Sequence, residues 1–186
     1  IIMVERAGVE TFAKLIDFGL VKELGSSDKT TSKFVVGSPM YMAPEQIRAT
    51  GVDDRTDVYA LGLTIYFTLS GRKPYPERGI DSLLHAQLNE PVDPLVNHTS
   101  HVPSNHPILQ IIDIATSKDP KNRFQNTEQM LKALSILLKD SENLETSFAI
   151  QDGSLYHNGA LVQGEIPSLP LTDPKLYLRD GSGISE

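Results

Sequence analysis

Two short apolar runs open the chain. Residues 1–4 are Ile-Ile-Met-Val and residues 12–16 are Phe-Ala-Lys-Leu-Ile, with the polar Glu-Arg-Ala-Gly sequence at 5–8 between them. Short apolar runs around a glycine-containing polar stretch are typical of two strands joined by a turn. From 21 to 36 the apolar pattern is lost, and residues 25–32 are polar or Gly throughout. We interpret that segment as a loop.

The middle of the chain predicts helices. Residues 58–71 contain no charged side chain, which indicates a helix that is buried on all faces. Thr56-Asp57 marks its expected start, and Ser70-Gly71 its expected end. Pro44-Glu45 can open a short helix, because proline suits the first turn and a carboxylate favours the positive end. Another short helix is expected over 80–89.

Two amphipathic helices are predicted after a Pro-, His- and Ser-rich loop at 91–106. Ile108, Ile111, Ile112 and Ala115 lie on one helical face, and we expect Asn105 to cap this helix with Pro107 in its first turn. The second helix carries an apolar stripe from Met130 to Leu138.

Asn126 and Gln129 resemble a capping box at the start of that second helix. Beyond about residue 140 the composition shifts to Gly, Ser, Pro and Asp, so we interpret 140–186 as a linker or tail. Asp152-Gly153 and Asn158-Gly159 are turn signals, and a short hairpin is expected over 155–162.

Composition narrows the class of protein. The chain has 186 residues, 17 Lys and Arg against 24 Asp and Glu, and a net charge of −7. Without a run of basic residues this balance argues against a nucleic-acid partner. The absence of cysteine excludes disulfides and thiolate metal sites and fits a reducing compartment, so we expect a cytoplasmic protein. No apolar stretch approaches the roughly 18 residues of a membrane span.

Candidate chemistry begins at Asp17-Phe18-Gly19, which directly follows the second apolar run. A carboxylate at the end of a strand can hold a hard cation such as Mg²⁺ against phosphate oxygens. The alternative is an ordinary turn that begins with an aspartate. Three further blocks follow in order: Gly-Ser-Pro-Met-Tyr-Met-Ala-Pro-Glu at 37–45, Asp-Val-Tyr-Ala-Leu-Gly at 57–62, and Asp119-Pro120 before Arg123.

These four blocks resemble, in the same order, segments of the large lobe of Ser/Thr protein kinases of the bacterial or related type. The resemblance covers about residues 1–139 and implies a mainly α fold, a partial protein kinase with a short N-terminal β-hairpin. It implies a chain that begins just after the catalytic loop, so the small lobe and the catalytic base would lie upstream of Ile1. We therefore expect a partial kinase domain at 1–139, followed by the linker or tail.

The resemblance also implies roles for individual residues. Asp17 would be the Mg²⁺ ligand and, with Phe18 and Gly19, part of the ATP site. Ser38 would lie beside the substrate hydroxyl. Glu45 and Arg123 would form a buried ion pair, although a lone Arg123 would otherwise be interpreted as a surface residue.

Other implied roles have a plain alternative. Asp57 resembles the aspartate that accepts backbone N–H groups from the catalytic loop. The less favoured alternative is a local N-cap, and the two roles are compatible. Thr30, Thr31 and Ser32 lie where such kinases are phosphorylated, or they belong to a solvated linker. His98, His101 and His106 share one loop with a spacing loosely compatible with zinc, but without Cys or a regular acidic ligand.

The function implied is part of an ATP- and Mg²⁺-dependent kinase that phosphorylates Ser or Thr hydroxyls of proteins. The sequence contains no Gly-rich phosphate loop, no Val-Ala-Ile-Lys strand and no His-Arg-Asp catalytic loop. Phosphoryl transfer needs a complete set of positioned groups, so we expect this chain alone to be inactive. The alternative is a non-catalytic, pseudokinase-like binding or scaffold module.

Overall fold

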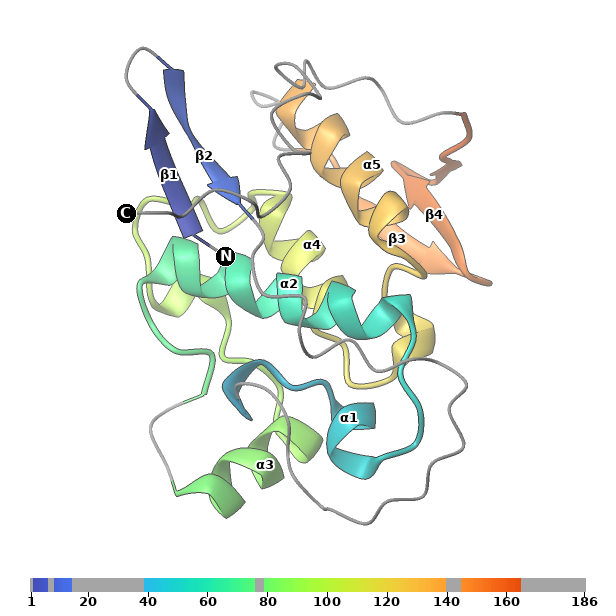
Figure 1. Ribbon diagram of the computed structural model, residues 1–186. Helices are drawn as coiled ribbons and strands as arrows, with labels where there is room; N and C mark the ends of the chain where they lie inside the picture. The colour runs from blue at the N-terminus through green and yellow to red at the C-terminus, as the bar shows by residue number, and fades with distance from the viewer. Residues whose placement is uncertain (1, 7–8, 15–38, 76–78, 140–144, 165–186) are drawn as a thin grey trace, which may run out of the picture. The chain divides into compact units, whose positions relative to one another are not determined.

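A computed structural model describes residues 2–6, 9–14, 39–75, 79–139 and 145–164 (Figure 1). It divides into two compact units, residues 1–39 and 40–186. In the first unit, strands β1 (Ile2–Arg6) and β2 (Val9–Lys14) pair antiparallel, with Ile2 opposite Lys14. The two strands expected from the sequence are therefore present, and β2 begins three residues earlier than the apolar pattern indicated.

Helix α2 (Asp54–Ser70) is the longest helix among the described residues, and it packs against α4 (Ile108–Ala115) and α5 (Thr127–Lys139) (Figure 1). Its N-cap is Asp53, whose carboxylate accepts a hydrogen bond from the Arg55 N–H at 3.0 Å. The hydroxyl of Thr56 accepts from the Asp53 N–H at 3.4 Å, which completes a capping box. The expected start at Thr56-Asp57 was therefore wrong: the helix begins at Asp54, because Asp53 caps it and Thr56 is the N3 residue of the capping box.

The burial of α2 changes along its length. Val58, Tyr59 and Leu63 are completely buried, whereas Phe67 in the last turns is 41% exposed and Leu69 is 37% exposed. The prediction of burial on every face is therefore wrong: one face of the helix is buried, Ala60 and Leu61 are half-buried, and the last turns are exposed. The helix ends as expected at Gly71, which has a φ of 65° and donates its N–H to the Phe67 carbonyl at 2.8 Å.

Helices α1 (Pro44–Arg48) and α3 (Ile80–Asn89) begin where the sequence placed them, and they contact each other. Between α3 and α4, the segment expected to be a loop contains a 3₁₀ helix, η2 (Leu95–Asn97). Leu95 is 3% exposed and belongs to the main core. One buried leucine in a polar stretch has no period, so the apolar pattern could not reveal it.

Helix α4 (Ile108–Ala115) buries the predicted face, but Asn105 is not its cap. The Nδ1 atom of His106 accepts a hydrogen bond from the Ile108 N–H at 3.2 Å instead. At α5 (Thr127–Lys139) the Asn126 side chain does cap, since it accepts from the Gln129 N–H at 2.9 Å. The second bond of the expected capping box, from the Asn126 N–H to the Gln129 side chain, is replaced: the Gln129 side chain accepts from the Gln125 N–H at 2.8 Å.

Three short strands follow: β3 (Phe148–Gln151), β4 (Ser154–His157) and β5 (Ala160–Leu161). They form an antiparallel meander in the order β3-β4-β5. Its turns, Asp152-Gly153 and Asn158-Gly159, have positive φ at both residues, which is the geometry that favours such pairs in two-residue hairpins. The sequence had indicated only the second of these two hairpins.

The meander packs on the helical core. Phe148 and Leu155 are buried in the same cluster as residues of α4 and α5. The Gln129 amide of α5 also donates to the Gly153 carbonyl at 2.8 Å. The packed core thus includes residues beyond the expected boundary at 139. The sequence did not reveal this, because short strands joined by turns of Asp, Asn and Gly have the composition of a linker.

Candidate functional site

Glu45 and Arg123 lie 78 positions apart in the chain and form a buried ion pair. Glu45 is the second residue of α1, and Arg123 follows the 3₁₀ helix η3 (Pro120–Asn122). The Nη1 atom of Arg123 lies 2.7 Å from Oε1 of Glu45, and Nη2 lies 2.9 Å from Oε2. Two parallel, charge-assisted bonds of this kind fix the relative orientation of both side chains. The ion pair implied by the resemblance is thus present in the structure.

Every N–H of the Arg123 guanidinium has an acceptor. Beyond the two bonds to Glu45, Nε donates to the Ser117 carbonyl at 2.7 Å, Nη1 to the Arg55 carbonyl at 2.9 Å and Nη2 to the Lys118 carbonyl at 3.3 Å. An arginine has five N–H donors. A completely buried charge is tolerated here because all five are used.

Tyr59 and Thr56 of α2 complete the surroundings of the ion pair. The guanidinium carbon lies 4.8 Å from the centre of the Tyr59 ring, within cation–π range. The Thr56 hydroxyl donates to Oε1 of Glu45 at 2.9 Å. Burial alone would raise the pKa of Glu45, but the hydrogen bonds and positive charge of Arg123 outweigh it, so the pKa lies below its usual value. Glu45 is therefore ionised at neutral pH.

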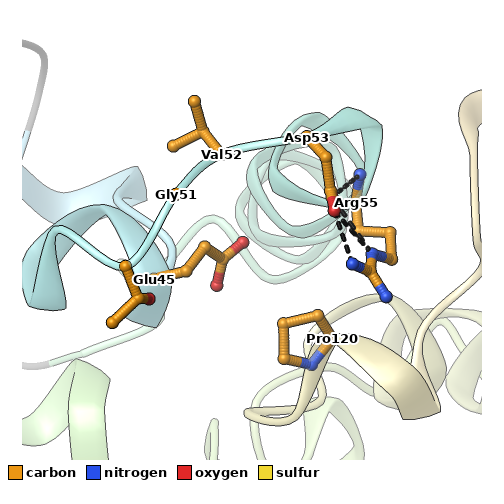
Figure 2. Close-up of a pocket in the computed structure, with 7 residues that line it drawn as sticks. Glu45, Gly51, Val52, Asp53, Arg55 and Pro120 are labelled. Atoms are coloured by element: carbon orange, nitrogen blue, oxygen red, sulfur yellow. Dashed lines mark hydrogen bonds and ion pairs between the residues drawn. The ribbon is translucent and has the colours of Figure 1, made fainter.

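A polar pocket of about 270 Å³ opens beside this ion pair. Its lining comes from α1, the loop after it, the start of α2 and η3, and consists of Glu45, Thr50, Gly51, Val52, Asp53, Arg55 and Pro120. Figure 2 shows the Asp53 carboxylate joined to Arg55, whose Nε lies 3.0 Å from Oδ1. Arg55 also donates to the Gln125 side chain at 3.3 Å. Arg55, the arginine of this pocket, is therefore already hydrogen-bonded to both Asp53 and Gln125.

Asp57 lies in the first turn of α2 and is exposed. The N-cap alternative for this residue was wrong, because Asp53 occupies that position. Several other residues singled out from the sequence lie outside the described residues. They are Asp17, Phe18, Gly19, Thr30, Thr31, Ser32 and Ser38.

The three histidines of the 91–106 segment do not form a metal site. His98 lies 2.6 Å from the Asp93 carboxylate, and His106 accepts the backbone bond described above. Within the described ranges, no three His, Cys, Asp or Glu side chains lie close enough together to hold a metal ion. The same ranges contain no helix with the length and apolar character needed to cross a membrane.

Sequence reasoning missed Lys118 and assigned no role to Tyr59. Both residues contact Arg123. The Lys118 carbonyl accepts a hydrogen bond from the Arg123 guanidinium, and the Tyr59 ring lies against that guanidinium. A signal was available, since Lys118 directly precedes Asp119-Pro120 and Tyr59 lies inside the block at 57–62. Asp53 and Arg55 belong to no block of the resemblance and left no such signal.

Comparison with known proteins gives the family. Residues 2–134 match the protein kinase domain family. The chain is 36% identical over 143 residues to the serine/threonine-protein kinase Pkn1 of Myxococcus xanthus, covering 75% of this chain and 20% of that protein. It is 29% identical over 163 residues to the serine/threonine-protein kinase PknB of Mycobacterium tuberculosis, covering 87% of this chain and 25% of PknB.

A further relative, the serine/threonine-protein kinase pkn3 of Myxococcus xanthus, is 27% identical over a match of 186 residues that covers 97% of this chain and 33% of that protein. The chain therefore belongs to the protein kinase domain family, with bacterial-type Ser/Thr kinases among its relatives. It spans about a fifth to a third of the length of these relatives.

Proposed function

We propose that this chain is the large-lobe part of a cytoplasmic Ser/Thr protein kinase that transfers the γ-phosphoryl group of ATP to hydroxyls of a protein substrate. The observation that carries the proposal is the bidentate ion pair between Glu45 and Arg123. It joins the end of the Ala-Pro-Glu block to the Asp-Pro-x-x-Arg block, as the kinase resemblance implied from sequence alone. Membership of the family supports the same function.

The ion pair has a clear mechanical use in such an enzyme. It anchors the C-terminal end of the segment that runs from Asp17 to Glu45, because Arg123 is itself held by three backbone carbonyls. Ser38 lies only seven positions before Glu45 in the sequence, so we propose that this anchor serves to position it for the reaction. Phosphoryl transfer depends on such positioning more than on covalent chemistry by the protein.

Asp17 is the residue that we propose to hold Mg²⁺, with Phe18 and Gly19 shaping the turn around it. When bound, the ion neutralises charge on the phosphate oxygens of ATP. Ser38 would orient the acceptor hydroxyl. Phosphorylation at Thr30, Thr31 or Ser32 would add close to two negative charges to that segment. We propose Lys22, Lys29 and Lys33 as its nearby cationic partners.

The test measures ³²P transfer from [γ-³²P]ATP to protein by the full open reading frame that contains these residues. We expect Mg²⁺-dependent transfer to Ser or Thr, reduced at least about a hundredfold by Asp17→Asn, since a metal supplies several kcal/mol of transition-state stabilisation. The matched control is Asp28→Asn, which removes the same charge in the following segment and should leave the rate unchanged.

Two results would count against this proposal. Equal rates for Asp17→Asn and Asp28→Asn would remove Asp17 from the metal site. An absence of transfer by the full reading frame, with no stabilisation against heat by Mg²⁺ and ATP, would favour the non-catalytic scaffold. The 186-residue chain alone should transfer no phosphate, and measurable transfer by it would contradict the expected need for further catalytic parts.

A further inference from the structure

Lys118 lies between α4 and η3, and its ammonium group contacts three other segments. Its Nζ atom donates to the Tyr59 hydroxyl at 3.1 Å, to the Gln87 carbonyl at 2.8 Å and to the Tyr75 hydroxyl. A protonated lysine has three N–H donors, so the full capacity of the group is used. Lys118 therefore connects α2, α3 and the segment between them at a single atom.

The two tyrosines strengthen this junction. Tyr59 and Tyr75 are 0% and 2% exposed, and their hydroxyl oxygens lie 3.3 Å apart. The Tyr75 hydroxyl also donates to the Glu90 carbonyl at the end of α3, at 3.4 Å. Burial raises the pKa of both tyrosines, so both hydroxyls are neutral at physiological pH. Within the part of the chain that the structure describes, Nζ of Lys118 thus donates to two neutral hydroxyls and one backbone carbonyl.

The junction shares two groups with the Glu45–Arg123 ion pair. The first is the Tyr59 ring, whose centre lies 4.8 Å from the Arg123 guanidinium carbon and 5.5 Å from Nζ of Lys118. The second is the Lys118 peptide, whose carbonyl accepts from Arg123 at 3.3 Å. A displacement of Arg123 must therefore disturb the Lys118 peptide and the Tyr59 ring that contacts the Lys118 ammonium. It would thereby disturb the hydrogen bond from Lys118 to α3.

We propose that Lys118 is a positioning residue that couples helix α3 to the Glu45–Arg123 ion pair. When the ion pair is formed, the Lys118 peptide and the Tyr59 ring are fixed, and Nζ holds the Gln87 carbonyl of α3. When Glu45 is withdrawn from Arg123, this hold is weakened. The coupling involves no catalytic step, so its test does not depend on kinase activity.

Charge supports this coupling. Burial, followed by the positive charge of Arg123, lowers the pKa of Lys118 to about 8. The other charged groups that act on it are Glu90, which favours the ammonium, and Arg48, which opposes it. Glu45 neutralises Arg123. Removing the charge of Glu45 should therefore lower the pKa of Lys118 further, since it leaves an uncompensated cation beside it.

Helices α1 and α3 are also linked by a direct contact that does not involve Lys118, and the test must distinguish this contact from the coupling through Lys118. Arg48 of α1 donates to the Leu88 carbonyl of α3 at 3.4 Å. Glu45 and Arg48 lie on the same short helix, so a change at Glu45 could reach α3 without Lys118. The substitution Arg48→Ala removes this contact and leaves the ion pair in place.

The first experiment measures amide hydrogen exchange of α3 relative to α5 in the 186-residue chain at pH 7. Glu45→Gln should speed exchange in α3 about tenfold, the equivalent of one charge-assisted hydrogen bond. In a Lys118→Met background the same substitution should have no further effect, whereas in an Arg48→Ala background its effect should persist. If Glu45→Gln does not fold, Thr56→Val supplies a milder perturbation, because it removes the hydroxyl bond to Glu45.

The second experiment follows the Lys118 side chain directly by ¹³C NMR of its Cε through a pH titration. We expect a midpoint near 8, lowered by Glu45→Gln and unchanged by Glu128→Gln, which removes an equivalent charge on α5. A midpoint near the ordinary value of about 10.4 would overturn the proposal. An equal effect of Glu45→Gln on α3 exchange with and without Lys118 would also overturn it. The same holds if the effect of Glu45→Gln disappears in the Arg48→Ala background.

Discussion

Gly62 of α2 lies directly against Ala115 of α4. A Cβ atom added to Gly62 would stand 2.7 Å from the Ala115 Cβ and 3.0 Å from the Thr116 Cγ2. Neither neighbour is the end of a long side chain that could turn away. The two helices therefore approach as closely as they do because residue 62 has no side chain, and Ala115 belongs to the main hydrophobic core.

Gly62→Ala should destabilise the chain by about 1–3 kcal/mol. In an exposed helix the same change would stabilise by about 1 kcal/mol, but here the added methyl group overpacks the contact between α2 and α4. Urea denaturation measures the difference in unfolding free energy. Ala115→Gly in the same chain should recover part of the loss, because it removes the atom that clashes. A Gly62→Ala variant as stable as the unchanged chain would show that the helices can separate without cost.

Asp53 and Asp57 should differ in their contributions to stability. Asp53→Ala removes the side-chain cap of α2 and should cost about 0.5–2 kcal/mol. Asp57→Ala removes only an exposed charge from the first turn, worth about 0.3–1 kcal/mol through the helix dipole. Thermal unfolding of the two variants checks the order. A larger loss for Asp57→Ala would contradict the cap assignment and would indicate a partner for Asp57.

The helices were predictable wherever their apolar residues recur over several turns. The stripes of α4 and α5 and the uncharged length of α2 were visible in the sequence. Helix starts were less predictable, because several aspartates lie before the apolar run that begins at Val58. Thr56, in the N3 position relative to Asp53, is what marks Asp53 as the cap. The β3-β4-β5 meander was missed in part because its strands are too short to show a period.

The candidate site was predictable only as far as the resemblance reached. Glu45 and Arg123 could be paired because each ends a block with a fixed place in the kinase family. Lys118 and Tyr59 could not be paired, since the contact depends on α2, α3 and the loop after α4 meeting at one point. Such a junction is a property of the packed core and has no spacing signature along the chain.

Acid should weaken the fold partly through Glu45. Its pKa in the folded chain lies below the ordinary value of 4.5, so the folded state binds its proton less readily than the unfolded state. The resulting stability is fully present above the unfolded pKa and is lost as the pH falls through the folded one. Urea denaturation between pH 6 and 3 should show the unchanged chain losing more stability than Glu45→Gln. Parallel profiles would contradict this prediction.

The ion pair itself should show strong non-additivity in a double-mutant cycle. Arg123→Met leaves Glu45 buried without its cation, and Glu45→Met leaves Arg123 without its anion, so each should cost about 3–5 kcal/mol. The double variant should cost less than their sum, by up to about 3 kcal/mol. It should not regain full stability, because the carbonyls of Arg55, Ser117 and Lys118 lose their donor. Each unsatisfied buried group costs about 1–3 kcal/mol.

Urea denaturation of all four chains gives the coupling energy. Additive losses would mean that Arg123 stabilises the fold through the carbonyls alone, and that Glu45 contributes independently.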